Sequence, residues 1–117
     1  MPLRSFLRAK IHHARVTETN REYVGSIGVD PELLRLAGIA PFERVDVYNV
    51  DNGERLTTYA IAGEPGQISL NGAAAHKASP GQRVIIAAYA MLSPEEVERH
   101  VPRIVIVGPG NVPVAKQ

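Results

Sequence analysis

Residues 44–62, with the sequence RVDVYNVDNGERLTTYAIA, decide the fold that this chain is predicted to adopt. Two extended runs, 44–50 and 54–62, flank a turn that contains Asn52 and Gly53. An Asn-Gly pair between such runs is among the strongest local signals of a β-hairpin, because both residues tolerate the positive φ angles of a tight turn. The stretch therefore predicts two adjacent antiparallel strands.

The sequence on either side of this hairpin also favours short strands. Five further runs alternate in polarity or are apolar, as strands are, and they cover residues 7–17, 23–29, 67–70, 83–90 and 103–107. These seven strands do not alternate regularly with helices, and no internal repeat is present. The pattern favours a mainly β protein with a small closed barrel. The Gly- and Pro-rich residues 108–117 are predicted to form a flexible tail.

Two short helices carry clear start signals. Asp30 followed by Pro31 is typical of an N-cap and a first helical residue, and Gly38 is a natural stop. The sequence Ser-Pro-Glu-Glu from Ser93 to Glu96 has the form of a capping box. We therefore expect two short helices between strands.

Length and composition limit what the protein does. A chain of 117 residues is long enough for one domain, so residues 1–117 are taken as a single unit. The absence of cysteine excludes disulfides, a thiol nucleophile and cysteine-ligated metals, and it favours a reducing compartment. A formal charge of +1 gives no general case for binding nucleic acid or an anionic membrane. The longest apolar run, 84–92, is far shorter than the roughly 18 residues of a membrane span, and no signal peptide is visible, so we expect a cytoplasmic protein.

One dipeptide, Gly25-Ser26, suggests chemistry. The motifs of phosphate-binding loops, dinucleotide folds, zinc proteases and serine hydrolases are all missing. His12 and His13 are adjacent, so a regular strand would turn them to opposite faces and give no metal site. A serine hydroxyl can attack the preceding carbonyl if the backbone is held out of its usual geometry and the oxyanion is stabilised. The product is an ester, which can eliminate.

The order of several motifs resembles the pyruvoyl-dependent aspartate 1-decarboxylases over residues 3–107. The motifs are Lys10-Ile11-His12, Tyr23-Val24-Gly25-Ser26, Asn52-Gly53, Arg55, Thr57-Thr58-Tyr59-Ala60-Ile61 and Asn71-Gly72-Ala73-Ala74-Ala75-His76. The loop 63–66 is about two residues shorter than is usual in that family, but this departure touches no matched site residue. The resemblance implies a six- to seven-stranded double-psi β-barrel.

The resemblance also implies that the chain cuts itself between Gly25 and Ser26. Ser26 would attack the Gly25 carbonyl to form an ester, and elimination would release residues 1–25 from residues 26–117. The dehydroalanine left at residue 26 would lose ammonia and become a covalent pyruvoyl group. The sequence leaves open whether cutting is spontaneous or needs a maturation helper.

Thr58 resembles the residue whose hydroxyl assists this self-cleavage. In a regular strand over 54–62, Arg55, Thr57 and Tyr59 share one face and Thr58 lies on the other. Because the resemblance assigns both Thr58 and Tyr59 to one site, we expect a bulge or a sharp twist near Thr58.

The activity implied by the resemblance is conversion of L-aspartate to β-alanine and CO₂, which supplies pantothenate and coenzyme A synthesis. A pyruvoyl ketone would form a Schiff base with the substrate, without pyridoxal phosphate and without metal. Tyr59 resembles the proton donor, and a phenol carries its proton at neutral pH. Arg55 is matched to a substrate carboxylate because its guanidinium is planar and always charged, with Lys10 adding positive charge.

The remaining site residues are assigned by the same resemblance. Gly72, Ala73 and Ala74 would form a backbone cradle, since small side chains let a ligand approach main-chain N–H groups. Asn71 would orient this cradle or the Gly25 carbonyl. Thr58 would also contact substrate, and the supporting residues are His12 and Tyr23. The family assembles as homotetramers, so we expect Lys10 to reach a site on a neighbouring subunit.

Two other functions stay open from the sequence. A small double-psi barrel can serve as a non-enzymatic interaction module, since a fold does not fix a function. The basic first 25 residues are either a solvated face or a site for an acidic ligand such as nucleic acid, which would show strongly salt-dependent binding.

Overall fold

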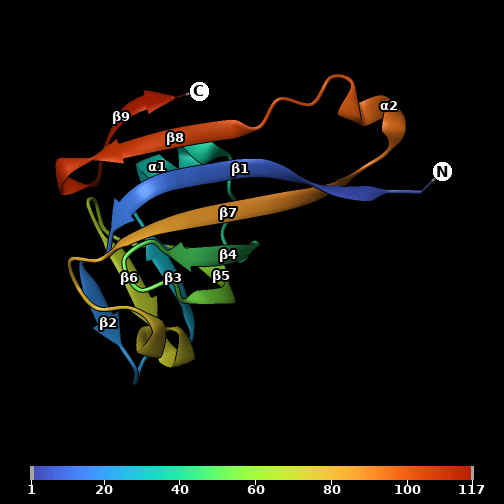
Figure 1. Cartoon of the computed structure of the whole chain (residues 1–117). Coiled ribbons are helices and arrows are strands. Elements are labelled where there is room, and N and C mark those ends of the chain that lie inside the picture. Colours follow the sequence, from blue (N-terminus) through green and yellow to red (C-terminus); the bar gives the residue numbers. More distant parts are fainter. Residues whose placement is uncertain (1, 117) are drawn as a thin grey trace.

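The hairpin expected from residues 44–62 forms two neighbouring strands of one large sheet (Figure 1). The computed structural model describes residues 2–116. Its strands are β1 (Arg4–Arg15), β2 (Glu18–Asn20), β3 (Ser26–Val29), β4 (Arg44–Asn49), β5 (Arg55–Ala62), β6 (Ile68–Asn71), β7 (Arg83–Leu92), β8 (Arg103–Gly108) and β9 (Val112–Lys116). The helices are α1 (Pro31–Ala37) and α2 (Pro94–Val97), with the 3₁₀ helices η1 (Gly72–Lys77) and η2 (Pro109–Asn111). The mainly β fold class is therefore confirmed.

The sheet bends back on itself because of where the chain passes from β1 to β2. The hydrogen-bonded order is β2-β6-β3-β5-β4-β7-β1-β8-β9. Although β2 and β1 lie far apart in this order, only Val16 and Thr17 separate them along the chain. The Val16 amide donates to the Gln82 carbonyl and the Thr17 amide to the Ile68 carbonyl, both at 2.8 Å. This junction brings β2 and β6, the first two strands of the order, beside β7. Such a return is in keeping with a double-psi barrel, although no hydrogen-bonded ladder among residues 2–116 joins β2 to β9.

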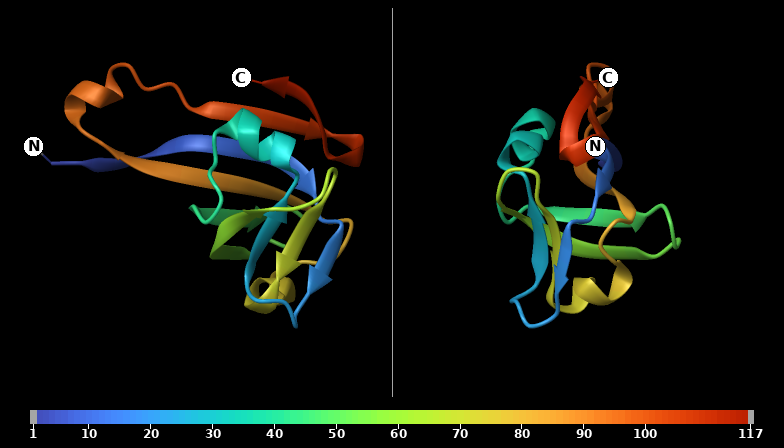
Figure 2. Two further views of the ribbon diagram at one scale, coloured as in Figure 1. Left: turned by 180° about the vertical axis from the view of Figure 1, so that it is seen from behind. Right: turned by 90° about the vertical axis from the view of Figure 1, so that its left-hand side faces the viewer.

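One apolar core fills the inside of this curved sheet. Its largest fully buried side chains come from six strands, α1 and the β1–β2 junction, and they include Ile11, Ile27, Leu33, Val45, Ile68 and Ile86. Beyond the core, β1 and β7 extend together toward the N-terminus and α2 (Figure 2). No helix within residues 2–116 is long and apolar enough to cross a membrane.

The β4–β5 hairpin is regular, so the bulge expected near Thr58 is not present. Pairing runs without a register shift from Tyr48 opposite Arg55 to Arg44 opposite Tyr59. On its other edge, β5 pairs with β3 only from Ala60 onward. The edge of β5 before Ala60 is therefore free of β3, and this opening, rather than a bulge, lets both Thr58 and Tyr59 border one cavity.

Both predicted helices form with the expected caps. The Asp30 side chain accepts a hydrogen bond from the Glu32 amide at 2.8 Å, and Gly38 ends α1 with φ 70°. Ser93 and Glu96 form the reciprocal hydrogen bonds of a capping box at α2. These local signals were sufficient because each cap is completed within a few residues.

The flexible tail predicted for residues 108–117 is wrong for the part that the structure describes. After η2, strand β9 pairs antiparallel with β8. Buried Asn111 anchors the turn, because its side chain accepts from the Arg15 amide at 2.7 Å and donates to the carbonyls of Arg15 and Gly66, both at 2.9 Å. Partners this distant in sequence are not visible in local composition. Gln117, the last residue of the predicted tail, lies outside the described residues.

His12 and His13 do not point to opposite faces of β1. Their rings stack with centroids 3.8 Å apart. The β1–β7 register shifts between Ile11 and Ala14, and His13 has φ 65°. The expectation of opposite faces was wrong because it assumed a regular strand, whereas this strand is bulged at the histidines.

Candidate active site

Ser26 is the first residue of β3, which lies between two other strands. It pairs with Asn71 of β6 on one side, and the next residue, Ile27, pairs with Ala60 of β5 on the other. Only 1% of Ser26 is exposed. The predicted strand over 23–29 is thus confirmed only from Ser26 onward, and Gly25 precedes the sheet as irregular chain.

The backbone at Ser26 is held in an unusual conformation. Its φ angle is 107°, in the region that residues with a side chain rarely adopt. Such a conformation costs on the order of 1–3 kcal/mol and persists only where the surroundings impose it. Here β5 and β6 bracket the strand, so the peptide that joins Gly25 to Ser26 leaves the sheet in a strained geometry. A backbone held out of its usual geometry was the condition set for attack on the Gly25 carbonyl.

A buried amide fixes the side chain of Ser26. Asn71 Nδ2 donates to Ser26 Oγ at 3.2 Å. On the other side of the same amide, Ser69 Oγ donates to Asn71 Oδ1 at 2.8 Å. The structure therefore brings Asn71 against the serine hydroxyl, where its N–H group can stabilise negative charge that develops on Oγ.

A cavity of about 260 Å³ opens beside Ser26. Its lining includes seven of the residues assigned from the sequence, which are Gly25, Ser26, Thr58, Tyr59, Asn71, Ala73 and Ala74. Tyr59 comes close to the Gly25–Ser26 peptide, since a Cβ added to Gly25 would lie 3.9 Å from Tyr59 Oη. Ser26, Gly25 and the Tyr59 phenol thus border one open cavity.

Gly72 belongs to the same site although it does not line the cavity. It has φ 62°, and an added Cβ would lie 2.8 Å from Gly25 Cα and 2.9 Å from Gly25 N. Real Cβ atoms essentially never approach backbone atoms this closely. The start of η1 therefore packs directly on the Gly25 backbone and requires glycine here for both space and conformation.

The other predicted residues are not brought to this cavity within the chain. Arg55 lines an adjoining cavity of about 250 Å³, which shares Leu56 and Thr57 with the first. Tyr23 is half exposed and lines a third cavity, which shares Asn71. Lys10 and His12 lie on β1, whose ladder partners are β7 and β8.

The side chain of Arg55 rests on the ring of Tyr48, which is itself held by Tyr89. Its guanidinium carbon lies 4.5 Å from the centre of the Tyr48 ring, a cation–π contact. The Tyr48 hydroxyl is 2.8 Å from that of Tyr89, and burial followed by this hydrogen bond raises the pKa of Tyr48. Arg55 therefore rests on a neutral aromatic surface.

Three residues that line the cavity were missed by the sequence analysis: Leu56, Thr57 and Lys77. Lys77 ends η1, three residues after Ala74, and side chains three apart lie on the same side of a 3₁₀ helix. The three-residue spacing could have identified Lys77, but only if residues 72–77 had been predicted to form a 3₁₀ helix.

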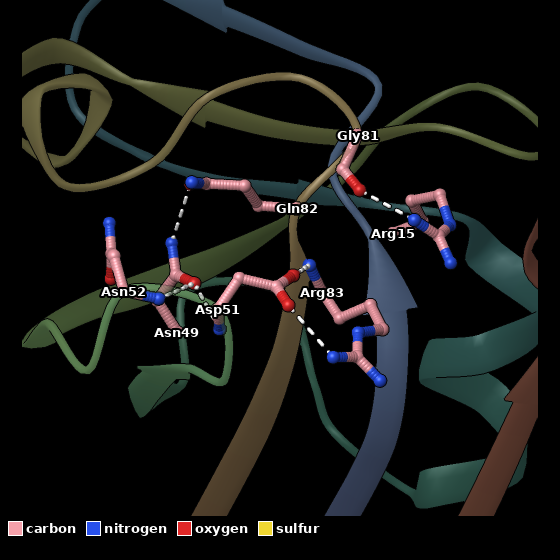
Figure 3. Close-up of polar contacts among 7 residues, drawn as sticks. All are labelled: Arg15, Asn49, Asp51, Asn52, Gly81, Gln82 and Arg83. Atoms are coloured by element: carbon pink, nitrogen blue, oxygen red, sulfur yellow. Dashed lines mark hydrogen bonds and ion pairs between the residues drawn. The ribbon is translucent and has the colours of Figure 1, made fainter.

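A polar network holds the β4–β5 turn to residues 82 and 83, which follow η1 (Figure 3). Asn49 Oδ1 accepts from the Asp51 and Asn52 amides, and Asn49 Nδ2 donates to Gln82 Oε1 at 2.9 Å. Asp51 also binds the backbone and the guanidinium of Arg83. The turn is thereby held to the segment that follows η1.

Comparison with known proteins gives a consistent result. Residues 2–114 match the sequence model of a family described as aspartate decarboxylase. An aspartate 1-decarboxylase of Azotobacter vinelandii is 56% identical over 91% of this chain and 86% of its own length. Enzymes of the same name from Acaryochloris marina and Thioalkalivibrio sulfidiphilus are 54% and 52% identical, covering 92% and 93% of this chain and 84% and 88% of their own lengths.

Proposed function

Because the chain belongs to the aspartate decarboxylase family, we propose that it converts L-aspartate to β-alanine and CO₂ with a pyruvoyl group made from its own Ser26. The observation that carries this proposal is the buried Ser26, with φ 107°, at a cavity that also holds Tyr59. We further propose that the β-alanine supplies pantothenate synthesis in the cytoplasm.

The residues at the cavity fit a group formed from Ser26. Gly72 leaves no room for a Cβ against Gly25, so the small residues of η1 reach the backbone where the group would form. Ala73 and Ala74 continue this surface along the cavity wall. A pyruvoyl group supplies a ketone that accepts the substrate amine and takes up the electron pair released with CO₂.

Self-cleavage begins with Ser26 Oγ. It attacks the Gly25 carbonyl carbon, the C–N bond breaks, and the hydroxyl proton passes to the freed amine of residue 26. Thr58, on the same cavity wall, donates to the carbonyl oxygen as it gains charge. Elimination then passes the Cα proton to water and breaks the Cβ–Oγ bond, which leaves Gly25 as a carboxylate and residue 26 as dehydroalanine. Water hydrolyses the resulting enamine to the ketone and ammonia.

In turnover, separate residues bind the substrate and move the proton. Tyr59 Oη donates a proton to the carbon that has lost CO₂, because it is the phenol that lines the cavity. Arg55 holds a carboxylate from the adjoining cavity. Lys10 adds positive charge from a neighbouring copy in a homotetramer, which accounts for its position on β1 outside the cavity.

The proposal is tested by removing the Ser26 hydroxyl. Ser26→Ala should give one uncut chain that releases no CO₂ from L-aspartate, whereas Ser79→Ala, at an exposed turn, should cut and turn over normally. Release of CO₂ and formation of β-alanine are measured together. A wild-type protein that stays uncut and inactive would instead favour a non-enzymatic interaction module.

A further inference from the structure

Lys77 places a positive charge on the wall of the Ser26 cavity. Among the described residues that line this cavity, it is the one with a charged side chain. The substrate class proposed above is a dicarboxylate, and one of its carboxylates must be held while the other leaves. A cation in the same cavity as Ser26 suits that requirement without help from another subunit.

The main chain at Lys77 is anchored, whereas the ammonium is not. Its carbonyl accepts hydrogen bonds from Asn49 Nδ2 at 3.2 Å and Asn52 Nδ2 at 3.1 Å. These amides belong to the polar network of the β4–β5 turn (Figure 3). The root of the side chain is therefore fixed beside the cavity, and its four-carbon stem allows the ammonium to move over a limited range.

Glu54 holds this ammonium in a weak ion pair. Lys77 Nζ lies 3.3 Å from Glu54 Oε1, and the two side chains are 46% and 38% exposed. Pairs this exposed contribute little to stability, so an incoming carboxylate can replace Glu54 at little cost. Glu54 and a substrate carboxylate would then compete for the same cation.

We propose that Lys77 is a substrate-binding residue that exchanges Glu54 for a carboxylate of the dicarboxylic substrate. The proposal rests on the proposed function of the cavity, and it adds a cation from the same subunit to those assigned from the resemblance. Lys77 binds the carboxylate that is retained, because a strong ion pair to the departing carboxylate would stabilise the ground state and oppose its loss.

Substitutions of Lys77 and Glu54 should have opposite effects on KM for L-aspartate. Lys77→Met keeps the length of the side chain but removes its charge, and should raise KM for L-aspartate about tenfold with kcat nearly unchanged. Glu54→Gln removes the competitor and should lower KM about two- to threefold, within the range expected of an exposed pair. If the ion pair had only a structural role, Lys77→Met and Glu54→Gln would change KM in the same direction.

Matched controls separate this effect from general loss of charge. Glu32 and Arg35 form an exposed ion pair on α1, with 2.6 Å between Arg35 Nη2 and Glu32 Oε2, away from the cavity. Glu32→Gln and Arg35→Gln should leave KM unchanged. Lys77→Arg, which keeps the charge, should restore most of the affinity lost in Lys77→Met.

Binding of succinate gives a second readout that does not need turnover. Calorimetry should show about tenfold weaker succinate binding to Lys77→Met and tighter binding to Glu54→Gln, even if a variant fails to cut itself. An active wild type whose KM and succinate affinity are unchanged in Lys77→Met overturns the inference and leaves the decarboxylase intact. An inactive wild type overturns the proposed function, and succinate affinity then still tests Lys77.

Discussion

Ser26 and Arg55 are held in place in different ways. Ser26 begins β3, which is bonded on both edges and buried, and the serine hydroxyl takes a hydrogen bond from buried Asn71. Arg55 begins β5, is exposed, and rests on the ring of Tyr48 in an adjoining cavity. Strand register thus fixes Ser26, the group proposed for cutting, whereas Arg55, the group proposed to bind a carboxylate, has a long, exposed side chain.

The difference between the surroundings of Ser26 and Arg55 indicates which steps one chain could perform alone. We call Gly25, Ser26, Thr58, Asn71 and Gly72 the cutting group, and Lys10 and Arg55 the binding group. The chain assembles the cutting group around a single cavity, so cutting should need no second copy. It does not bring Lys10 to that cavity, so the contribution of Lys10 to binding should need assembly.

The largest effect is expected where the cutting group is tightest. In Gly72→Ala, the new Cβ would lie 2.8 Å from Gly25 Cα, so the backbone must shift. Cutting should slow on the order of a hundredfold or more, because the reacting atoms no longer meet. The fraction of cut chain over time, read by intact mass, measures this.

Gly53→Ala is the matched control for Gly72→Ala. Gly53 also has a positive φ, 79°, but an added Cβ meets nothing within 4 Å. The Gly53→Ala variant should lose on the order of 1–2 kcal/mol of stability and cut itself at the normal rate. Equal cutting in the two variants would show that the contact of Gly72 with Gly25 is irrelevant.

Tyr59→Phe should separate proton transfer from substrate binding. It removes the hydroxyl near Gly25 and keeps the ring, so we expect normal succinate binding and turnover about a hundredfold slower, as for loss of a general acid. Stopped-flow or steady-state release of CO₂ measures this. Unchanged turnover would remove Tyr59 from its role as proton donor.

Mixed assemblies test whether the binding group spans two subunits. Lys10→Ala and Arg55→Ala chains should each be cut but weakly active. Because some sites in a mixed tetramer carry both wild-type residues, co-expression should restore part of the activity, up to about a quarter. No gain from proven mixed assemblies, or an active monomer by light scattering, would contradict the shared site.

The smallest expected effect concerns His12 and the stability of the fold. Burial, followed by His13 and Lys10, lowers the pKa of His12 below 6.5. The unfolded chain therefore binds more protons between that lowered pKa and pH 6.5. The free energy of unfolding should therefore fall as pH drops from 7 toward 5.

Denaturant titrations at several pH values measure this slope. His12→Gln should flatten it, whereas exposed His76→Gln should leave it unchanged. A slope that is the same in wild type and His12→Gln would show that His12 does not titrate differently on folding.

The sequence predicted those parts of the fold that are encoded by neighbouring residues. The Asn52-Gly53 hairpin and the Asp30 and Ser93 caps are completed within a few positions, and each formed as expected. Strand β9 was missed because Asn111 is held by Arg15, 96 positions away. The bulge at His13 was missed because a register shift depends on the partner strand.

In the candidate site, too, the sequence predicted the features that short motifs encode and missed those that depend on distant parts of the chain. Gly25, Ser26, Thr58 and Tyr59 were found because they stand in short motifs, and the strand order brings them together. The opening on β5 that admits both Thr58 and Tyr59 depends on where β3 stops pairing, which no local pattern encodes. Lys77 was missed for a similar reason, since its place on the cavity wall depends on the packing of η1.

The intact mass of the purified wild-type protein is the most direct test of self-cleavage between Gly25 and Ser26. We expect two polypeptides, residues 1–25 ending in a free carboxylate and residues 26–117 without a free amino terminus. Reduction of the protein with borohydride in the presence of L-aspartate should add mass to the larger one alone. A single uncut chain of 117 residues, unchanged by this treatment, would contradict the account.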